Sequence, residues 1–171
     1  EIIAEARKLL NEEKYDESNS IIEEVISSSK DNKEAIEILI KNYVGLDEMD
    51  SAKQIIDSLE KSLLQNVNIK SAIEVYKLKK DTEESGPKDE VILLYKKDPL
   101  NIENSKKLSD IYFAEKNYDE AFNIIFNLYS KTKKENKDRV KKILLNYFEL
   151  LGNTHEKTKE ARRKLSSIMF S

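Results

Sequence analysis

The sequence contains no cysteine, one histidine, three glycines and two prolines among its 171 residues. Without cysteine the chain has no disulfide, no thiolate for a zinc site and no cysteine nucleophile. The single histidine, His155, excludes metal sites built from several histidines. The shortage of glycine and proline argues against a sheet protein, because hairpin turns use many of both. We therefore predict an all-α protein.

Long apolar runs are also missing. No run reaches the roughly 20 residues that a membrane-spanning helix requires, and the first residues show no signal-peptide pattern. The chain begins at Glu1 without an initiator methionine. We expect it to be a fragment of a longer bacterial protein in the cytoplasm. With 39% apolar residues, the chain is long enough for one domain with a continuous core, and we expect that domain to span residues 1–171.

The net charge of −3 is unevenly distributed along the chain. Residues 1–60 carry 16 acids and 7 bases, whereas residues 131–171 carry 5 acids and 12 bases. In a fold whose repeats are stacked in sequence order, one end would be acidic and the other basic. Ordinary solubilising charge explains the same pattern equally well.

Three segments of the sequence repeat one another. YDESNSIIEEVI (15–26) aligns with MDSAKQIIDSLE (49–60) at an offset of 34, and YDEAFNIIFNLY (118–129) follows the second copy by 69 residues. This period resembles the tetratricopeptide repeat (TPR), a helix–turn–helix unit that buries its apolar face by stacking on its neighbours. The resemblance implies a TPR-like right-handed α-solenoid of about ten helices with one degenerate repeat, and a protein that binds other proteins.

The apolar periodicity divides the chain into repeats with defined boundaries. We expect two repeats in 1–66, a degenerate repeat in 67–99, a third clear repeat in 100–134 and a C-terminal helix pair in 135–171.

Turn residues predict several local features. Gly45 suits a left-handed position at a helix end, and Asp50 suits the cap of the next helix. Residues 79–90 look like a loop, followed by a short helix that buries Leu94. Asn153 with Glu156 resembles a capping box before the last helix.

Candidate chemical groups are few. Adjacent acids such as Glu12 and Glu13 point about 100° apart on a helix, which suits a solvated face better than acid–base catalysis. His155 is interpreted as a surface or capping residue. The basic run 131–142 has no interleaved aromatics for nucleic-acid binding, and no glycine-rich phosphate loop exists. We predict no catalytic residue, cofactor, metal or nucleic-acid site, and no membrane interaction.

The first helix of each TPR unit lines a groove, which makes its polar face the candidate protein-binding surface. The candidates are Glu34, Glu37, Lys41, Val44, Glu103, Lys106, Asp110 and Phe113. The lysine–asparagine clamp that grips a C-terminal carboxylate in some TPR proteins is absent, since Glu37 and Lys41 stand where it has lysine and asparagine. A charged groove for an extended or helical peptide and a plain solvated face remain equally open.

Three strings resemble a more specific family: DPLNIENSKKLSDIYFAEKNYDEAFNIIFNLY (98–129), RVKKILLNYFELLGN (139–153) and ARRKLSSIMFS (161–171). They are similar to the C-terminal half of bacterial thioredoxin–TPR co-chaperones, the chaperedoxin family. The resemblance implies a thioredoxin-like domain upstream of Glu1. It also implies client proteins as partners, which the protein would hold and pass to GroEL-type or DnaK-type chaperones. The alternatives are the substrate-selecting half of a thiol-disulfide oxidoreductase and a stand-alone TPR scaffold.

The last helix is the segment that we expect to contact a chaperone. Ala161, Leu165 and Ile168 fall on one side and should dock on the preceding helix. Arg163 and Phe170 project from the opposite side, where an aromatic residue beside arginine suits a partner groove. The alternative is a frayed end at which Phe170 contacts nothing.

Overall fold

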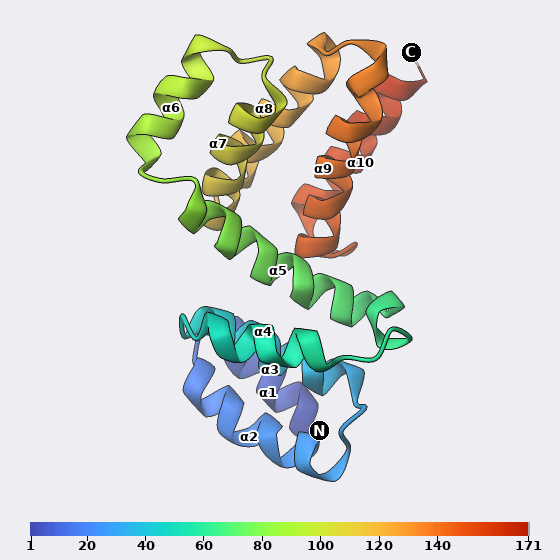
Figure 1. The fold of residues 1–171 in the computed structure, drawn as a ribbon. Helices are drawn as coiled ribbons and strands as arrows, with labels where there is room; N and C mark the ends of the chain where they lie inside the picture. Colours follow the sequence, from blue (N-terminus) through green and yellow to red (C-terminus); the bar gives the residue numbers. More distant parts are fainter. Residues whose placement is uncertain (171) are drawn as a thin grey trace. The chain divides into compact units, whose positions relative to one another are not determined.

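The computed structural model describes residues 1–170, which form ten α-helices and two short 3-10 helices, with no strand among them. The all-α prediction is confirmed. The α-helices are α1 (Ile2–Asn11), α2 (Tyr15–Ser28), α3 (Lys33–Gly45), α4 (Met49–Ser58), α5 (Val67–Glu84), α6 (Lys88–Lys97), α7 (Ile102–Ala114), α8 (Tyr118–Lys131), α9 (Lys137–Leu151) and α10 (Glu156–Met169). The 3-10 helices are η1 (Leu63–Gln65) and η2 (Lys134–Asn136). Figure 1 shows the course of the chain.

The chain divides into two compact units, Glu1–Lys77 and the remainder from Leu78. We refer to them as unit 1 and unit 2. In unit 1, α1 packs on α2 and α3, α2 packs on α3, and α3 packs on α4. Aliphatic residues make up the buried core of this unit: Ala6, Ile22, Ala35, Ile36, Ile38, Leu39, Ile40, Val44, Ala52, Ile69 and Ala72.

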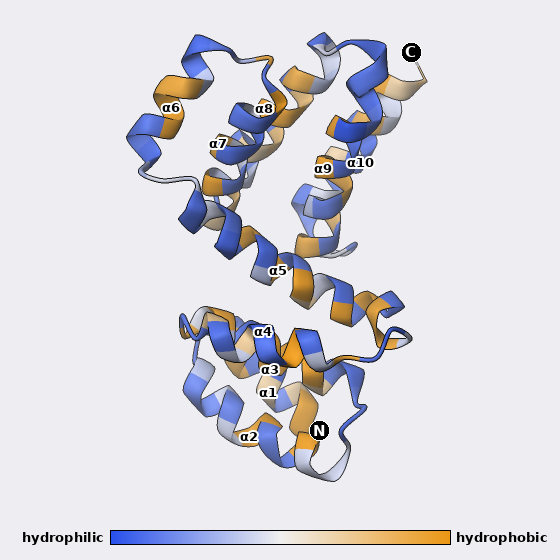
Figure 2. Ribbon diagram, in the orientation of Figure 1, coloured by the Kyte–Doolittle hydropathy of each residue, from blue (hydrophilic) through white to orange (hydrophobic). Residues whose placement is uncertain are grey.

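Unit 2 stacks helices in chain order, with α6 on α7, α7 on α8, α8 on α9, and α10 on both α8 and α9. Aromatic rings make up much of its core, and the following lie within it: Phe113, Phe122, Phe126, Tyr147 and Phe148. The hydropathy colouring of Figure 2 shows the alternation of apolar and polar residues along these helices that amphipathic packing requires.

The backbone conformation of the turns recurs at the same intervals as the sequence repeat. Among residues 1–170, the non-glycine residues with positive φ are Glu13, Asp47 and Lys116, at 61°, 61° and 63°, and they lie 34 and 69 residues apart. In each turn the next residue donates its N–H to a carbonyl five residues earlier, as Glu48 does to Tyr43 at 2.8 Å. This bond satisfies a carbonyl left open at the helix end. One turn geometry therefore recurs in three helix pairs.

Several local predictions are wrong. Gly45 lies within α3 without positive φ, and Asp47 occupies the left-handed position. Asp50 lies inside α4, whose N-cap is Glu48. Gly45 instead allows a close approach, because a methyl group added there would overlap the ring of Tyr15.

The middle of the chain is more helical than predicted. α5 continues to Glu84, so the loop between α5 and α6 is limited to residues 85–87. Pro87 is the N-cap of α6, where the absence of its N–H leaves no bond unmade. On α6, Val91 is buried but Leu94 is 43% exposed, so the prediction that Leu94 belongs to a buried stripe is wrong.

Candidate functional site

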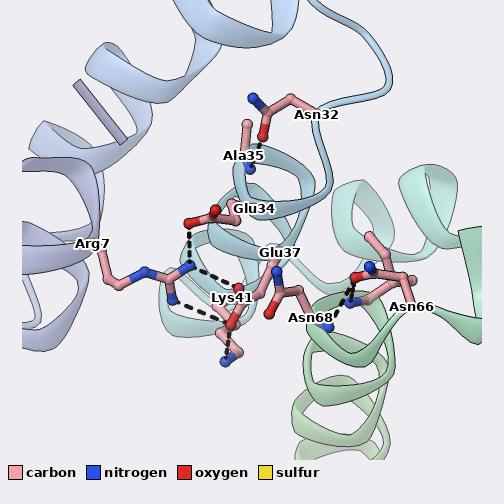
Figure 3. A network of polar contacts seen from close by, with 9 residues as sticks. Arg7, Asn32, Glu34, Ala35, Glu37, Lys41, Asn66 and Asn68 are labelled. Carbon is pink, nitrogen blue, oxygen red and sulfur yellow. Dashed lines mark hydrogen bonds and ion pairs between the residues drawn. The ribbon is translucent and has the colours of Figure 1, made fainter. Parts of the chain in front are cut away.

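In unit 1, α1 and α3 hold a network of charged side chains. Arg7 on α1 bonds both carboxylate oxygens of Glu37 on α3, at 2.9 and 3.3 Å. Lys41, one turn further along α3, donates to the same carboxylate at 2.7 Å, and Arg7 also lies 3.4 Å from Glu34. Figure 3 shows these side chains converging, with Asn32 capping the start of α3. Glu37 is only 4% exposed, whereas Glu34 remains in solvent.

The positive charges of Arg7 and Lys41 stabilise the negative charge of Glu37. Burial alone would raise the pKa of Glu37, but the hydrogen bond from Arg7 and the charge of Lys41 outweigh it and lower that pKa below its ordinary value. The bond to Glu37 likewise raises the pKa of Arg7. Glu37 and Arg7 are therefore held in their charged forms, and Glu37 is fully engaged within the chain.

Unit 2 places a second ion pair at the equivalent positions with the order of charge reversed. Lys106 and Asp110 of α7 follow Glu37 and Lys41 by 69 residues, and their side chains lie 2.6 Å apart. Lys106 also lies 3.4 Å from Asp81 of α5. Burial raises the pKa of Asp110, and the opposing effect of Lys106 does not overcome it. The charge of Asp110 therefore costs more here than that of Glu37 in unit 1.

An open polar cavity of about 360 Å³ adjoins this pair in unit 2. It lies between the end of α5 and α7. The lining residues are Asp81, Glu84, Ser85, Glu103, Lys106, Lys107 and Asp110. Three of the expected groove residues, Glu103, Lys106 and Asp110, thus meet in one place. The cavity can accept a polar or charged side chain, and its walls supply both donors and acceptors.

Val44 and Phe113 require a correction, because neither is available to a partner. Val44 is 4% exposed within the aliphatic core of unit 1. Phe113 is 5% exposed and stacks on Tyr147, with ring centroids 4.4 Å apart. Each lies three residues after the charged residue of its helix, Lys41 or Asp110, a rotation of about 60° that turns it toward the core.

The C-terminal helix α10 has the predicted two faces. Ala161 and Leu165 are buried and Ile168 packs partly against the same core, so the predicted inward stripe is confirmed. Arg163 is exposed, and Phe170 at the end of the helix is 87% exposed. An aromatic side chain with that much surface in water is the largest apolar exposure in the part of the chain that the structure describes.

The start of α10 differs from the predicted capping box. His155 is the N-cap, and its Nδ1 accepts a hydrogen bond of 3.1 Å from the N–H of Lys157. Asn153 instead accepts a bond of 2.7 Å from Arg162. The interpretation of His155 as a capping residue is confirmed, whereas the capping box of Asn153 and Glu156 is wrong.

Sequence reasoning missed Arg7, Asp81 and Tyr147 as members of these networks. The signal for Arg7 was present, because the 34-residue period maps it onto Lys41. Asp81 was hidden in a segment predicted to be a loop. Nothing in the sequence marks Tyr147 as the partner of Asp110, since its position in an apolar stripe explains it as core.

Two classes of site are not found among residues 1–170. No group of three or more histidine, cysteine or acidic side chains is arranged to hold a metal ion. No helix in this range combines the length and the apolar character needed to cross a membrane.

Comparison with known proteins gives one family. A family model described as "Tetratricopeptide repeat" matches residues 82–170, just over half of the chain. No curated protein matches the sequence. Among solved structures, the chain is similar to a domain of protein VP0806, of unknown function, from Vibrio parahaemolyticus RIMD 2210633. That likeness has 16% identity and a TM-score of 0.45, and covers 98% of this chain and 97% of the other.

Proposed function

The chain belongs to the tetratricopeptide repeat family, whose members generally serve as protein–protein interaction modules, and we propose that this one is the binding module of a co-chaperone. In this proposal it holds client proteins in the cytoplasm and docks on a chaperone of GroEL or DnaK type. The resemblance of residues 98–129 and 143–171 to thioredoxin–TPR co-chaperones supports the choice. The module itself is proposed to have no catalytic activity.

The observation that carries the docking proposal is the exposed end of α10. Phe170 is 87% exposed, Met169 is 43% exposed, and Arg163 projects into solvent on the same helix. Aromatic and arginine residues dominate the binding energy of protein interfaces. The buried stripe of Ala161 and Leu165 anchors the helix, so that this face is presented on a fixed support.

The ion networks of α3 and α7 support a division of labour within the module. Glu37 and Asp110 are buried and bonded to other residues of the chain, so their primary role is to fix the first helices of their repeats. The side chains left for a client are the more exposed ones around the cavity of unit 2, among them Glu84, Glu103 and Lys107.

The test of docking compares two double variants of the chain. Replacement of Arg163 and Phe170 by alanine should weaken binding to a GroEL-type chaperonin by about tenfold or more. The matched control replaces Leu93 and Lys96 of α6, an exposed apolar residue and an exposed base, by alanine. This control should bind the chaperonin as tightly as the wild-type chain does. Equal binding by both normally folded variants would remove α10 from the interface.

The test of holding follows light scattering by a heat-aggregating reporter protein, with and without the chain. Suppression of aggregation at stoichiometric ratios is expected. Reductase and isomerase assays on the same preparation should match buffer. Turnover that survives repurification and scales with protein concentration would refute the non-catalytic proposal.

A further inference from the structure

Positive charge is concentrated around the connection between α8 and α9. Residues 131–142, which we call the basic segment, contain seven bases and two acids. They comprise the last residue of α8, the η2 turn and the start of α9. In Figure 2 this connection and the first turns of α9 are coloured mostly hydrophilic. The segment belongs entirely to unit 2.

One base of the segment, Lys137, is held by contacts with α8. Lys137 donates a hydrogen bond of 2.5 Å to the carbonyl of Tyr129 and lies 4.5 Å from the centre of its ring. The remaining bases form no ion pair within the part of the chain that the structure describes: Lys131, Lys133, Lys134, Arg139, Lys141 and Lys142. Glu135 and Asp138 are exposed and form no ion pair with them either. Such crowded like charges produce a positive potential that attracts an anionic partner.

An exposed leucine borders these cations. Leu145 of α9 is 42% exposed, while its neighbour Leu144 is fully buried in the core. Leu145 follows Lys142 by three residues and Lys141 by four, so the three side chains share one side of the helix. An apolar side chain beside uncompensated cations suits a ligand that has both carboxylates and an aliphatic group.

We propose that the basic segment and Leu145 bind an acidic, extended protein segment that carries an aliphatic residue. This inference rests on the proposed function, because it takes the partner to be a protein, and it places a second interface on α9, separate from the end of α10. Nucleic acid fits less well. A phosphate backbone offers Leu145 no apolar partner, and Tyr129, the aromatic residue beside Lys137, is buried and cannot stack on a base.

The test measures binding of fluorescent probes to the full chain by anisotropy at about 150 mM salt, where bulk charge attraction is largely screened. The probes are a glutamate peptide with a central leucine, an all-glutamate peptide of the same length, and a single-stranded oligonucleotide of equal charge. The leucine-containing peptide should bind tightest. Oligonucleotide binding tighter than that of both peptides would overturn the proposal in favour of a nucleic-acid site.

Two triple variants with the same change in net charge separate a local site from bulk charge. Charge reversal within the segment, at Lys133, Lys134 and Lys142, should weaken peptide binding by about tenfold or more. Charge reversal of exposed lysines in unit 1, at Lys30, Lys61 and Lys70, should leave it within about threefold. Equal losses in the two variants would overturn the proposal.

A single variant tests the apolar contact. Leu145→Ala should weaken binding of the leucine-containing peptide several-fold and leave binding of the all-glutamate peptide unchanged. Equal binding of the two peptides to wild type would refute the apolar part of the proposal. If wild type binds neither peptide yet still suppresses client aggregation, this inference fails and the proposed function stands. If the wild-type chain does not suppress aggregation of the reporter protein, the proposed function itself is refuted.

Discussion

The hydroxyl of Tyr147 on α9 donates a hydrogen bond of 2.6 Å to the carboxylate of Asp110 on α7. The same hydroxyl lies 2.8 Å from Oγ of Ser109, which donates to the carbonyl of Ala121 on α8 at 2.7 Å. Burial, together with the charge of Asp110, raises the pKa of Tyr147 well above its ordinary value, so the phenol keeps its proton and acts as a donor. Three helices of unit 2 are thus joined through one buried polar chain.

Replacement of Tyr147 by phenylalanine should lower the free energy of unfolding by about 1–3 kcal/mol, because Asp110 stays buried with one partner fewer. The ring stacking on Phe113 is retained, so the loss reports the hydroxyl alone. Urea denaturation measures the change. Tyr95→Phe is the control, since Tyr95 packs partly on the core without a hydrogen bond in the described residues, and it should change stability by less than about 0.5 kcal/mol. Equal stabilities of the two variants would show that the bond to Asp110 contributes nothing.

The ion pair of Glu37 predicts a pH dependence. Its pKa is lower in the folded chain than its ordinary value of 4.5, so its contribution to stability is present above pH 4.5 and is lost as the pH falls through the folded pKa. Glu37→Gln should therefore be less stable than wild type at neutral pH, and the difference should shrink on acidification below pH 4.5. Urea denaturation from pH 7 to pH 3 measures it. Glu34→Gln is the control, because its carboxylate is exposed and farther from Arg7. A constant difference for Glu37→Gln at all pH values would show that shape and not charge is what matters.

The sequence predicted most of the helices because their buried faces repeat with helical period. The three repeated segments also begin where helices begin, since Tyr15, Met49 and Tyr118 are the first residues of α2, α4 and α8. The prediction failed on the last turns of α5. Residues 79–84 are mostly lysine and glutamate, which favour a helix intrinsically, but the segment lacks the apolar stripe on which the prediction relied.

Other errors arose because a contact across the fold decides what a residue does. Gly45 was expected to allow positive φ, yet the turn puts Asp47 there, and the glycine makes room for a ring from a different helix. Glu37 and Asp110 were expected to face a partner. Their burial depends on Arg7 and Tyr147, which lie 30 and 37 residues away in the sequence. No local pattern contains that information.

Ala121→Leu should destabilise the chain by about 1–3 kcal/mol, because three added carbon atoms must enter a filled site. Ala121 is fully buried on α8, and its carbonyl accepts the bond from Ser109, so the backbones of α7 and α8 approach closely there. The matched control is Ala114→Leu at the exposed end of α7, which should change stability by less than about 0.5 kcal/mol. Thermal unfolding compares them. An unchanged melting temperature for Ala121→Leu would contradict the helix register.

Gly45→Ala should destabilise the chain even though alanine is the better helix former. In an open helix this change would stabilise by about 1 kcal/mol. Here the new methyl group would overlap the ring of Tyr15, which begins α2, so either the ring or the helix pair must shift. The sign of the effect should therefore depend on Tyr15.

A double-mutant cycle tests this dependence. In a Tyr15→Ala background the obstacle is gone, and Gly45→Ala should become stabilising by up to about 1 kcal/mol. Urea denaturation of the four proteins gives the coupling energy. A destabilisation of the same size in both backgrounds would mean that the cost comes from the backbone of α3, and that the contact between Gly45 and Tyr15 does not determine how α2 packs on α3.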